Sequence, residues 1–173
     1  MRGSYAEAYR HHIGALRFWH ETGQPRWICW SLNRVAEIEL LARDAGSSWR
    51  VSAAMGRSAY ELLREAWYII EPTYMNLPHK SRTLHNLGWL AWHEGRIAEA
   101  EHYLQQALQI RQSYGNEYGI ARTLELLARQ RYTQRHNNDA KRYFAQARKI
   151  RKRLCIVQYP AVKRCCLSIQ RRL

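Results

Sequence analysis

The side chains best placed to do chemistry are the basic residues near the C-terminus. Half of the 28 Lys and Arg residues lie after position 128, where Asp139 is the one acid. The densest part of this segment comprises Arg148, Lys149, Arg151, Lys152, Arg153, Lys163 and Arg164. Clustered cations of this kind bind polyanions, so the segment is a candidate site for a nucleic acid or an acidic protein. A solvated basic face is the simpler interpretation, which we favour, because cations near a helix C-terminus also complement its dipole.

Residues that commonly carry catalysis or bind metals lack the spacing that these functions require. The eight histidines form no HExxH motif, and Glu99 and Glu101 would point to different sides of a helix. Glycine-rich nucleotide loops and the GxSxG motif do not occur. The four cysteines form no CxxC pair, which disfavours a disulfide framework or a zinc site and predicts a cytoplasmic location. The sequence therefore predicts a protein that is not an enzyme and needs no metal or cofactor.

Helices must position these side chains, because apolar residues recur at helical spacing along almost the whole chain. Turn-forming Gly, Pro and Asn residues divide this pattern into segments. The eight helices predicted in this way span 4–21, 26–42, 50–71, 78–93, 97–114, 118–133, 138–155 and 160–172. No alternating strand pattern competes with them, and no apolar run is long enough to cross a membrane. The sequence predicts an all-α protein.

Two stretches about 40 residues apart share one arrangement of large and small residues. The matching positions are Leu84 and Leu124, Leu87 and Leu127, Gly88 and Ala128, Ala91 and Arg131, Ala100 and Ala140, Leu104 and Phe144, and Ala107 and Ala147. In each stretch large side chains can enter the gaps that small residues leave, which close packing of two helices requires. A repeat of this length predicts a stack of helical hairpins.

These positions resemble the tetratricopeptide repeat, and the period is similar to the longer repeats of kinesin light chains and bacterial regulatory proteins. Arg131 departs from the small or aromatic residue of the family pattern, which predicts a looser edge there. The resemblance implies a right-handed α-solenoid of antiparallel helix hairpins. It divides a single solenoid (1–173) into a partial repeat at 1–24, repeats at 25–76, 77–116 and 117–156, and an unpaired terminal helix at 157–173.

Two aspects of this repeat frame stay open at the level of sequence. An insertion near 42–53 interrupts the first full repeat, either as a loop or as an extension of the flanking helices. The frame also begins and ends on helices without a mate, although a solenoid normally ends in a polar cap. We expect the chain to be an excerpt of a longer protein, with burial of these faces by self-association as the alternative.

The resemblance also implies a binding surface, because the first helices of successive repeats line a concave groove. The groove positions are Trp30, Asn33, Glu37 and Leu40, then Arg82, His85, Asn86, Trp89 and His93, then Arg122, Glu125, Arg129 and Tyr132. Aromatic anchors beside guanidinium and amide groups suit peptide recognition. Packing between repeats is the alternative role for Trp89. Glu37 occupies a position of the family's two-carboxylate clamp and would repel a carboxylate, which disfavours binding of chaperone tails.

Together these features predict a non-catalytic protein- or peptide-binding scaffold that uses the concave groove. The first alternative is nucleic-acid or other polyanion binding through the basic C-terminal quarter. The second is a homo-oligomerisation module that uses the unpaired terminal helices. The partner is expected to be a protein or peptide of unknown identity, and no contact with a membrane is expected.

Overall fold

The computed structural model describes residues 2–71 and 76–154, which form eight helices and no strand. In chain order these are α1 (Arg2–Glu21), α2 (Pro25–Asp44), α3 (Ser52–Met55), α4 (Ala59–Ile70), α5 (Leu77–His93), α6 (Ile97–Ser113), α7 (Glu117–Thr133) and α8 (Asn137–Arg153). The all-α prediction is confirmed. The helix expected at 160–172 lies outside the described residues. Among the helices described, none has the length and apolar character to span a membrane.

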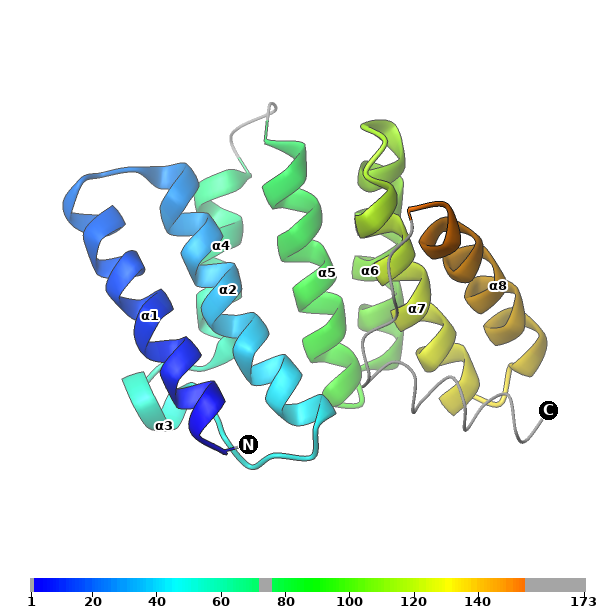
Figure 1. The fold of residues 1–173 in the computed structure, drawn as a ribbon, viewed down its shortest axis with the longest axis horizontal. Coiled ribbons are helices and arrows are strands. Elements are labelled where there is room, and N and C mark those ends of the chain that lie inside the picture. The colour runs from blue at the N-terminus through cyan, green and yellow to red at the C-terminus, as the bar shows by residue number, and fades with distance from the viewer. Residues whose placement is uncertain (1, 72–75, 155–173) are drawn as a thin grey trace. The chain divides into compact units, whose positions relative to one another are not determined.

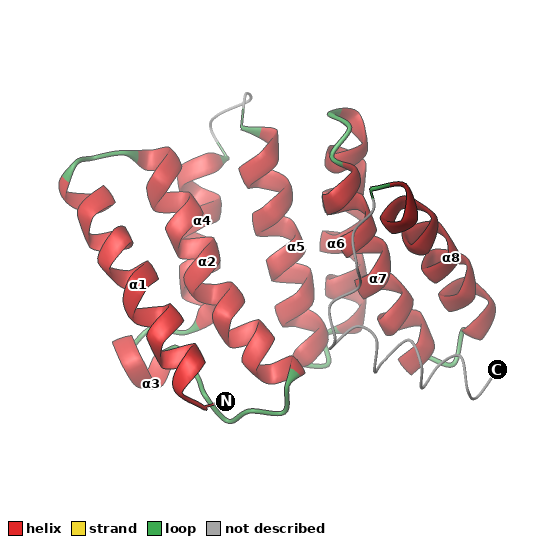
Figure 2. Ribbon diagram, in the orientation of Figure 1, coloured by secondary structure: helices red, strands yellow, loops and turns green. Residues whose placement is uncertain are grey.

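The chain divides into two compact units, one of residues 1–115 with α1 to α6 and one of residues 116–173 with α7 and α8. In the first unit, α1, α2 and α5 lie side by side, and α4 and α6 pack behind α2 and α5 (Figures 1 and 2). The helices pair as the hairpins α2–α4 and α5–α6, and α4 also packs against α5. The second unit is the α7–α8 hairpin.

The first unit has a continuous apolar core. Its largest fully buried side chains are Leu32, Leu40, Leu62, Leu63, Ile70, Leu90 and Leu104. Gly88 lets α5 and α6 approach closely, because a Cβ added there would lie 2.7 Å from Cγ of Leu104 and 3.0 Å from the carbonyl oxygen of Ala100. This contact explains why the sequence has glycine in the middle of a helix, where it is otherwise unfavourable.

The segment predicted as one helix at 50–71 is instead two, and this prediction was wrong. Gly56 takes a left-handed conformation with φ of 69° and ends the short helix α3. Ser58 then starts α4 as a capping box, in which its backbone N–H donates to Glu61 (2.6 Å) and its hydroxyl oxygen accepts from the Glu61 backbone N–H (3.2 Å). Helix α4 ends at Ile70.

The insertion after α2 forms a loop that a buried carboxylate ties to the helix. The Glu39 side chain, 2% exposed, accepts a hydrogen bond from the backbone N–H of Val51 at 2.8 Å. It also accepts from the Arg43 guanidinium at 2.6 Å. The Tyr9 hydroxyl of α1 donates to the carbonyl oxygen of Ala54 at 3.5 Å. The insertion is therefore held against both α1 and α2.

In the second unit, α7 and α8 bury the small and apolar positions of the repeat, among them Leu127, Ala128, Ala140 and Ala147. The side chain of Asn116 caps α7 by accepting from the backbone N–H of Gly119 at 3.0 Å. The turn between the helices contains Arg135 at φ 63°, a left-handed conformation that residues other than glycine rarely adopt.

Candidate protein-binding surface

Helix α2 carries a row of accessible side chains that are suited to holding a partner. Trp27, Trp30, Arg34 and Leu41 are spaced by three, four and seven residues, which places them on one side of the helix. Trp27 is 40% exposed and Leu41 is 46% exposed, whereas Trp30 is half-buried. We call these four residues the α2 row. It offers apolar anchors at both ends and a guanidinium between them.

The guanidinium of Arg34 is held in place by two neighbours. It lies 6.0 Å from the ring centroid of Trp30, and its Nη1 donates to Oε2 of Glu37 at 2.8 Å. From α1, the ring of His12 meets Trp30 edge to face at 5.6 Å. Burial, followed by the nearby Arg34 charge, lowers the pKa of His12. His12 is thus kept neutral over a wider pH range than a free histidine.

Asn33 and Asn86, both expected in the groove, are instead buried between α2 and α5. The Asn33 amide donates to Oγ1 of Thr83 at 2.8 Å and to the carbonyl oxygen of Cys29 at 3.0 Å. Its own oxygen accepts from the Asn86 amide at 3.0 Å. Both asparagines are at most 1% exposed, so they fasten the two helices and do not face solvent. Burial also raises the pKa of the neighbouring Cys29 thiol to about 11.

The remaining groove candidates of the first unit are mostly buried as well. Leu40 is fully buried, His85 is 2% exposed and Glu37 is 4% exposed. Trp89, 5% exposed, donates from Nε1 to Oδ1 of Asp44 at 3.3 Å, and His93 Nε2 lies 2.9 Å from the same oxygen.

Trp89 therefore packs between helices and is not an accessible anchor. The α2 row contains the tryptophans of α2 that remain accessible. Arg82 is half-buried.

In the second unit, Arg122, Arg129 and Tyr132 are half-buried, whereas Glu125 is buried in an ion pair. The Arg151 guanidinium donates from Nε and Nη2 to the two Glu125 carboxylate oxygens, each at 2.8 Å. These hydrogen bonds raise the pKa of Arg151. Arg151 and Glu125 thus join α8 to α7, and Arg151 is not accessible to a phosphate.

The candidate polyanion residues divide into paired and exposed groups. Arg151 is paired with Glu125, and Arg153 binds the Glu117 carboxylate. Arg148, Lys149 and Lys152 are exposed, as is Lys141, which lies about two turns before Arg148 on α8. Within the part of the chain that the structure describes, these four side chains form no ion pair. Lys163 and Arg164 lie outside the described residues.

Sequence reasoning did not identify Trp27, Arg34 and Leu41. Their spacing of three, four and seven residues, with Trp30, was visible in the sequence as a helical stripe.

Metal binding finds no support in the geometry, since no group of three His, Cys, Asp or Glu side chains within residues 2–71 and 76–154 could hold an ion. Cys29 is a free, buried thiol.

Comparison with known families and structures agrees with this geometry. The family model for the tetratricopeptide repeat matches residues 50–113 and 80–153, and the chain belongs to that family. Its repeats serve in general as protein-interaction scaffolds.

Among solved structures, the fold is similar to BtubC (BKLC) from P. vanneervenii, a kinesin light chain-like protein, with a TM-score of 0.63 at 20% identity. The match covers 91% of this chain and 59% of BtubC. The predicted resemblance to long-period repeats is confirmed. No curated protein matches the chain.

Proposed function

We propose that this chain is a non-catalytic binding module that receives a peptide or protein along the side of its first unit where α1, α2 and α5 lie side by side. The α2 row is the observation that carries the proposal. Trp27, Trp30 and Leu41 supply apolar area, and Arg34 supplies directed hydrogen-bond donors. Tryptophan and arginine are the side chains that most often dominate the energy of an interface.

The buried contacts beneath the row support this function because they hold α2 and α5 in one geometry. Asn33, Thr83 and Asn86 form hydrogen bonds whose donors and acceptors require a single register. A surface that is already rigid loses less conformational entropy when a partner binds. Arg82, half-buried on α5, is a further guanidinium that we assign to this surface.

Affinity capture from native lysate, with and without nuclease, would identify partners for quantitative binding. Trp30→Ala and Arg34→Ala are each expected to weaken a nuclease-resistant partner by about tenfold or more, as for interface hot spots. Gln109→Ala, at an exposed position of α6, is the matched control and should leave binding unchanged. Equal affinity of the wild type and both α2-row variants would rule out this surface.

The exposed cations of α8 favour a second candidate function, binding of a polyanion. Lys141, Arg148 and Lys152 are spaced by seven and four residues and share one side of the helix, with Lys149 beside them. Cations that lack a carboxylate partner can release the counterions of a phosphate backbone, and this makes binding dependent on salt.

Salt titration with single-stranded RNA and DNA would test the second candidate. The triple variant Lys141→Ala, Arg148→Ala and Lys152→Ala should reduce the slope of log affinity against log salt by about 2, since each phosphate contact contributes about 0.7. Arg153→Ala is the control, because Arg153 already pairs with Glu117. An unchanged slope in the triple variant would exclude this role for α8.

A further inference from the structure

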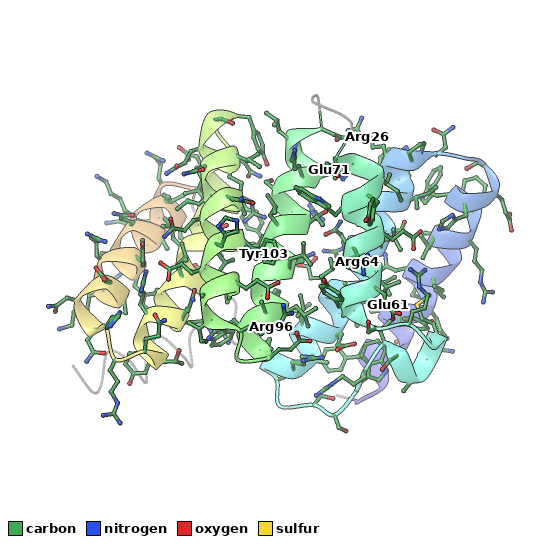
Figure 3. All side chains as sticks on the ribbon, turned by 180° about the vertical axis from the view of Figure 1, so that it is seen from behind. Arg26, Glu61, Arg64, Glu71, Arg96 and Tyr103 are labelled. Atoms are coloured by element: carbon green, nitrogen blue, oxygen red, sulfur yellow. The ribbon has the colours of Figure 1, made fainter. Side chains whose placement is uncertain are left out.

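Helix α4 presents a second row of side chains on the side of the first unit opposite to the α2–α5 face. Its apolar side, with Leu62, Leu63, Ala66 and Ile70, is buried in the core. Tyr60, Arg64 and Tyr68 are spaced by four residues each, so they lie along one exposed side of the helix. Figure 3 shows Glu61 and Arg64 on α4, with Arg96 at the start of α6 and Tyr103 on α6, in the view from behind. We call Tyr60, Arg64 and Tyr68 the α4 row.

The α4 row places a guanidinium between two aromatic rings. The Arg64 guanidinium carbon lies 5.9 Å from the ring centroid of Tyr60 and 6.0 Å from that of Tyr68. A second guanidinium, that of Arg96, lies 5.8 Å from the ring centroid of Tyr60. Rings that neighbour the guanidinium restrict its motion and remove part of its water, and its N–H groups remain able to donate.

Arg64 differs from the neighbouring arginines because it lacks a carboxylate partner. Arg57 pairs with Glu65 at 2.5 Å, and Arg96 pairs with Glu94 at 2.5 Å and with Glu99. Among the described residues no carboxylate lies within ion-pair distance of Arg64.

Two carboxylates of α4 lie close to Arg64 along the chain, and both already have partners. Glu65 pairs with Arg57, and Glu61, one turn away, is bound by Ser58. Glu61 accepts from the backbone N–H of Ser58 at 2.6 Å and from the Ser58 hydroxyl at 2.9 Å. Hydrogen bonds from Ser58, and after them the charges of Arg57 and Arg64, lower the pKa of Glu61. Arg64 forms no ion pair with this carboxylate, so its N–H groups remain able to bind an outside partner.

The exposed tyrosines add apolar area on either side of that charge. Tyr68 is 65% exposed and Tyr60 is 37% exposed. Tyrosine and arginine are enriched at interface hot spots, and an arginine can bind a carboxylate through two parallel hydrogen bonds. Tyr60 and Tyr68 are eight positions apart, or about 12 Å along the helix at 1.5 Å per residue. A partner helix matches this length when its own residues at i, i+4 and i+8 are apolar, acidic and apolar.

We propose that the α4 row is a second docking surface, and that it takes an acidic amphipathic helix whose carboxylate binds Arg64 between two apolar side chains. The surface is separate from the α2 row and does not depend on it. A chain with both surfaces would bridge two partners, one on each side of the first unit.

A designed pair of peptides would test this proposal by fluorescence anisotropy. The probe is a capped, labelled, alanine-based helix with Leu, Glu and Leu at i, i+4 and i+8, and the matched peptide has Gln in place of Glu. The wild type should bind the Glu peptide about tenfold more tightly than the Gln peptide, as expected for a charge-assisted hydrogen bond. Arg64→Ala should lose this difference, so that the two peptides bind the variant equally.

Two further variants separate the effect of the Arg64 charge from that of apolar area and from that of a paired arginine. Tyr68→Ala should weaken both peptides by a similar factor, because it removes apolar area and leaves the charge. Arg57→Ala removes an arginine that already has a carboxylate partner, and it should leave both affinities within twofold of the wild type. Circular dichroism of each variant checks that the helices are retained.

The proposal is overturned if the Glu peptide does not bind at millimolar concentration, or if the Glu and Gln peptides bind the wild type equally. It is also overturned if a labelled oligouridylate binds more tightly than the Glu peptide and loses affinity in both Arg64→Ala and Tyr68→Ala. In that case the row would stack on nucleotide bases.

Discussion

The α5–α6 hairpin and the α7–α8 hairpin share one pattern of large and small residues, yet different groups hold each pair of helices together. In α5–α6, Gly88 brings the backbone of one helix against Leu104 and Ala100 of the other. In α7–α8, the equivalent position is Ala128, and the bidentate ion pair of Arg151 with Glu125 joins the helices. The repeat pattern therefore specifies which helices pair, and it leaves open the chemistry that joins them.

The turns of the two hairpins differ in the same way. Gly95, at φ 77°, adopts a left-handed conformation at no steric cost. Its counterpart about 40 residues later is Arg135, at φ 63°. The α7–α8 hairpin thus accommodates local strain at its turn and relies more on its ion pair. Three variants test this contrast, and a pH titration tests the packing of α2 on α5 for comparison; they follow in order of decreasing expected effect.

Arg151→Met should destabilise the α7–α8 hairpin by about 3 to 5 kcal/mol, because it leaves the Glu125 carboxylate buried without a partner. Amide hydrogen exchange in α7, compared with the wild type, measures this change. The double variant Glu125→Leu with Arg151→Met should recover most of the loss. If Arg151→Met alone is neutral, the ion pair does not hold the helices together.

The α2–α5 seam should lose stability at alkaline pH through Cys29. Burial raises the pKa of its thiol from 9.0 to about 11, so the folded protein keeps this proton to a higher pH than the unfolded chain does. The contribution of this thiol is therefore complete below about pH 9 and falls as the pH rises, by about 2 kcal/mol at pH 11, where the folded thiol is half ionised. Urea denaturation at pH 8 and pH 11 measures the loss.

Cys29→Ala provides the control for this titration, because the variant retains every other alkaline group. Its stability should fall less steeply between the two pH values than that of the wild type. Parallel pH profiles of the two proteins would show that the thiol does not contribute. At pH 8 the native protein should also leave Cys29 unmodified by iodoacetamide, as peptide mass spectrometry can show.

Gly88→Ala should destabilise the α5–α6 hairpin by about 1 to 3 kcal/mol, since the added methyl group meets Leu104 and the Ala100 backbone. Thermal unfolding followed by circular dichroism measures the change. Ala128→Gly is the converse variant in α7 and should cost about 1 kcal/mol through lower helix propensity. A stabilising effect of Gly88→Ala would show that the two helices separate easily.

Arg135→Gly should stabilise the α7–α8 hairpin by up to about 1 kcal/mol. Glycine adopts the left-handed conformation without strain, and we expect this gain to exceed the extra backbone entropy that glycine loses on folding. Gly95→Ala should act in the opposite direction in α5–α6. Denaturation midpoints of both variants would test the pair. A loss of stability in Arg135→Gly would indicate that the Arg135 side chain contributes more than its backbone strain costs.

Much of the fold could be predicted from sequence because the repeat pattern places small residues where helices must approach. The predicted helices at 78–93, 97–114 and 118–133 agree with α5, α6 and α7 to within a residue or so. The break at Gly56 was missed, since Ala53, Ala54 and Met55 favour helix on their own. The capping box of Ser58 and Glu61 is the local signal that marks the start of α4.

The proposed binding surface was harder to predict because its residues alternate with buried ones at short spacing. Asn33 and Arg34 are neighbours in sequence, but the first is buried and the second is accessible. A step of one residue along the helix turns the side chain from the buried side to the accessible side. Because an amide or a guanidinium can occupy either side, the residue types do not show which is buried. Likewise, the sequence could not show that Arg151 is paired and Arg148 is not, because that depends on Glu125 lying opposite on α7.

The contact of Glu39 with the Val51 backbone has a consequence for how this repeat can be altered. Since one carboxylate fixes the end of the insertion at Val51, the exposed turn before it, with Ala45, Gly46 and Ser48, is the place where a change in length or composition should disturb the helices least. A reporter domain or an epitope inserted there would leave the helical stack intact. The first full repeat thus contains a natural site for domain insertion, and a single side chain makes it available.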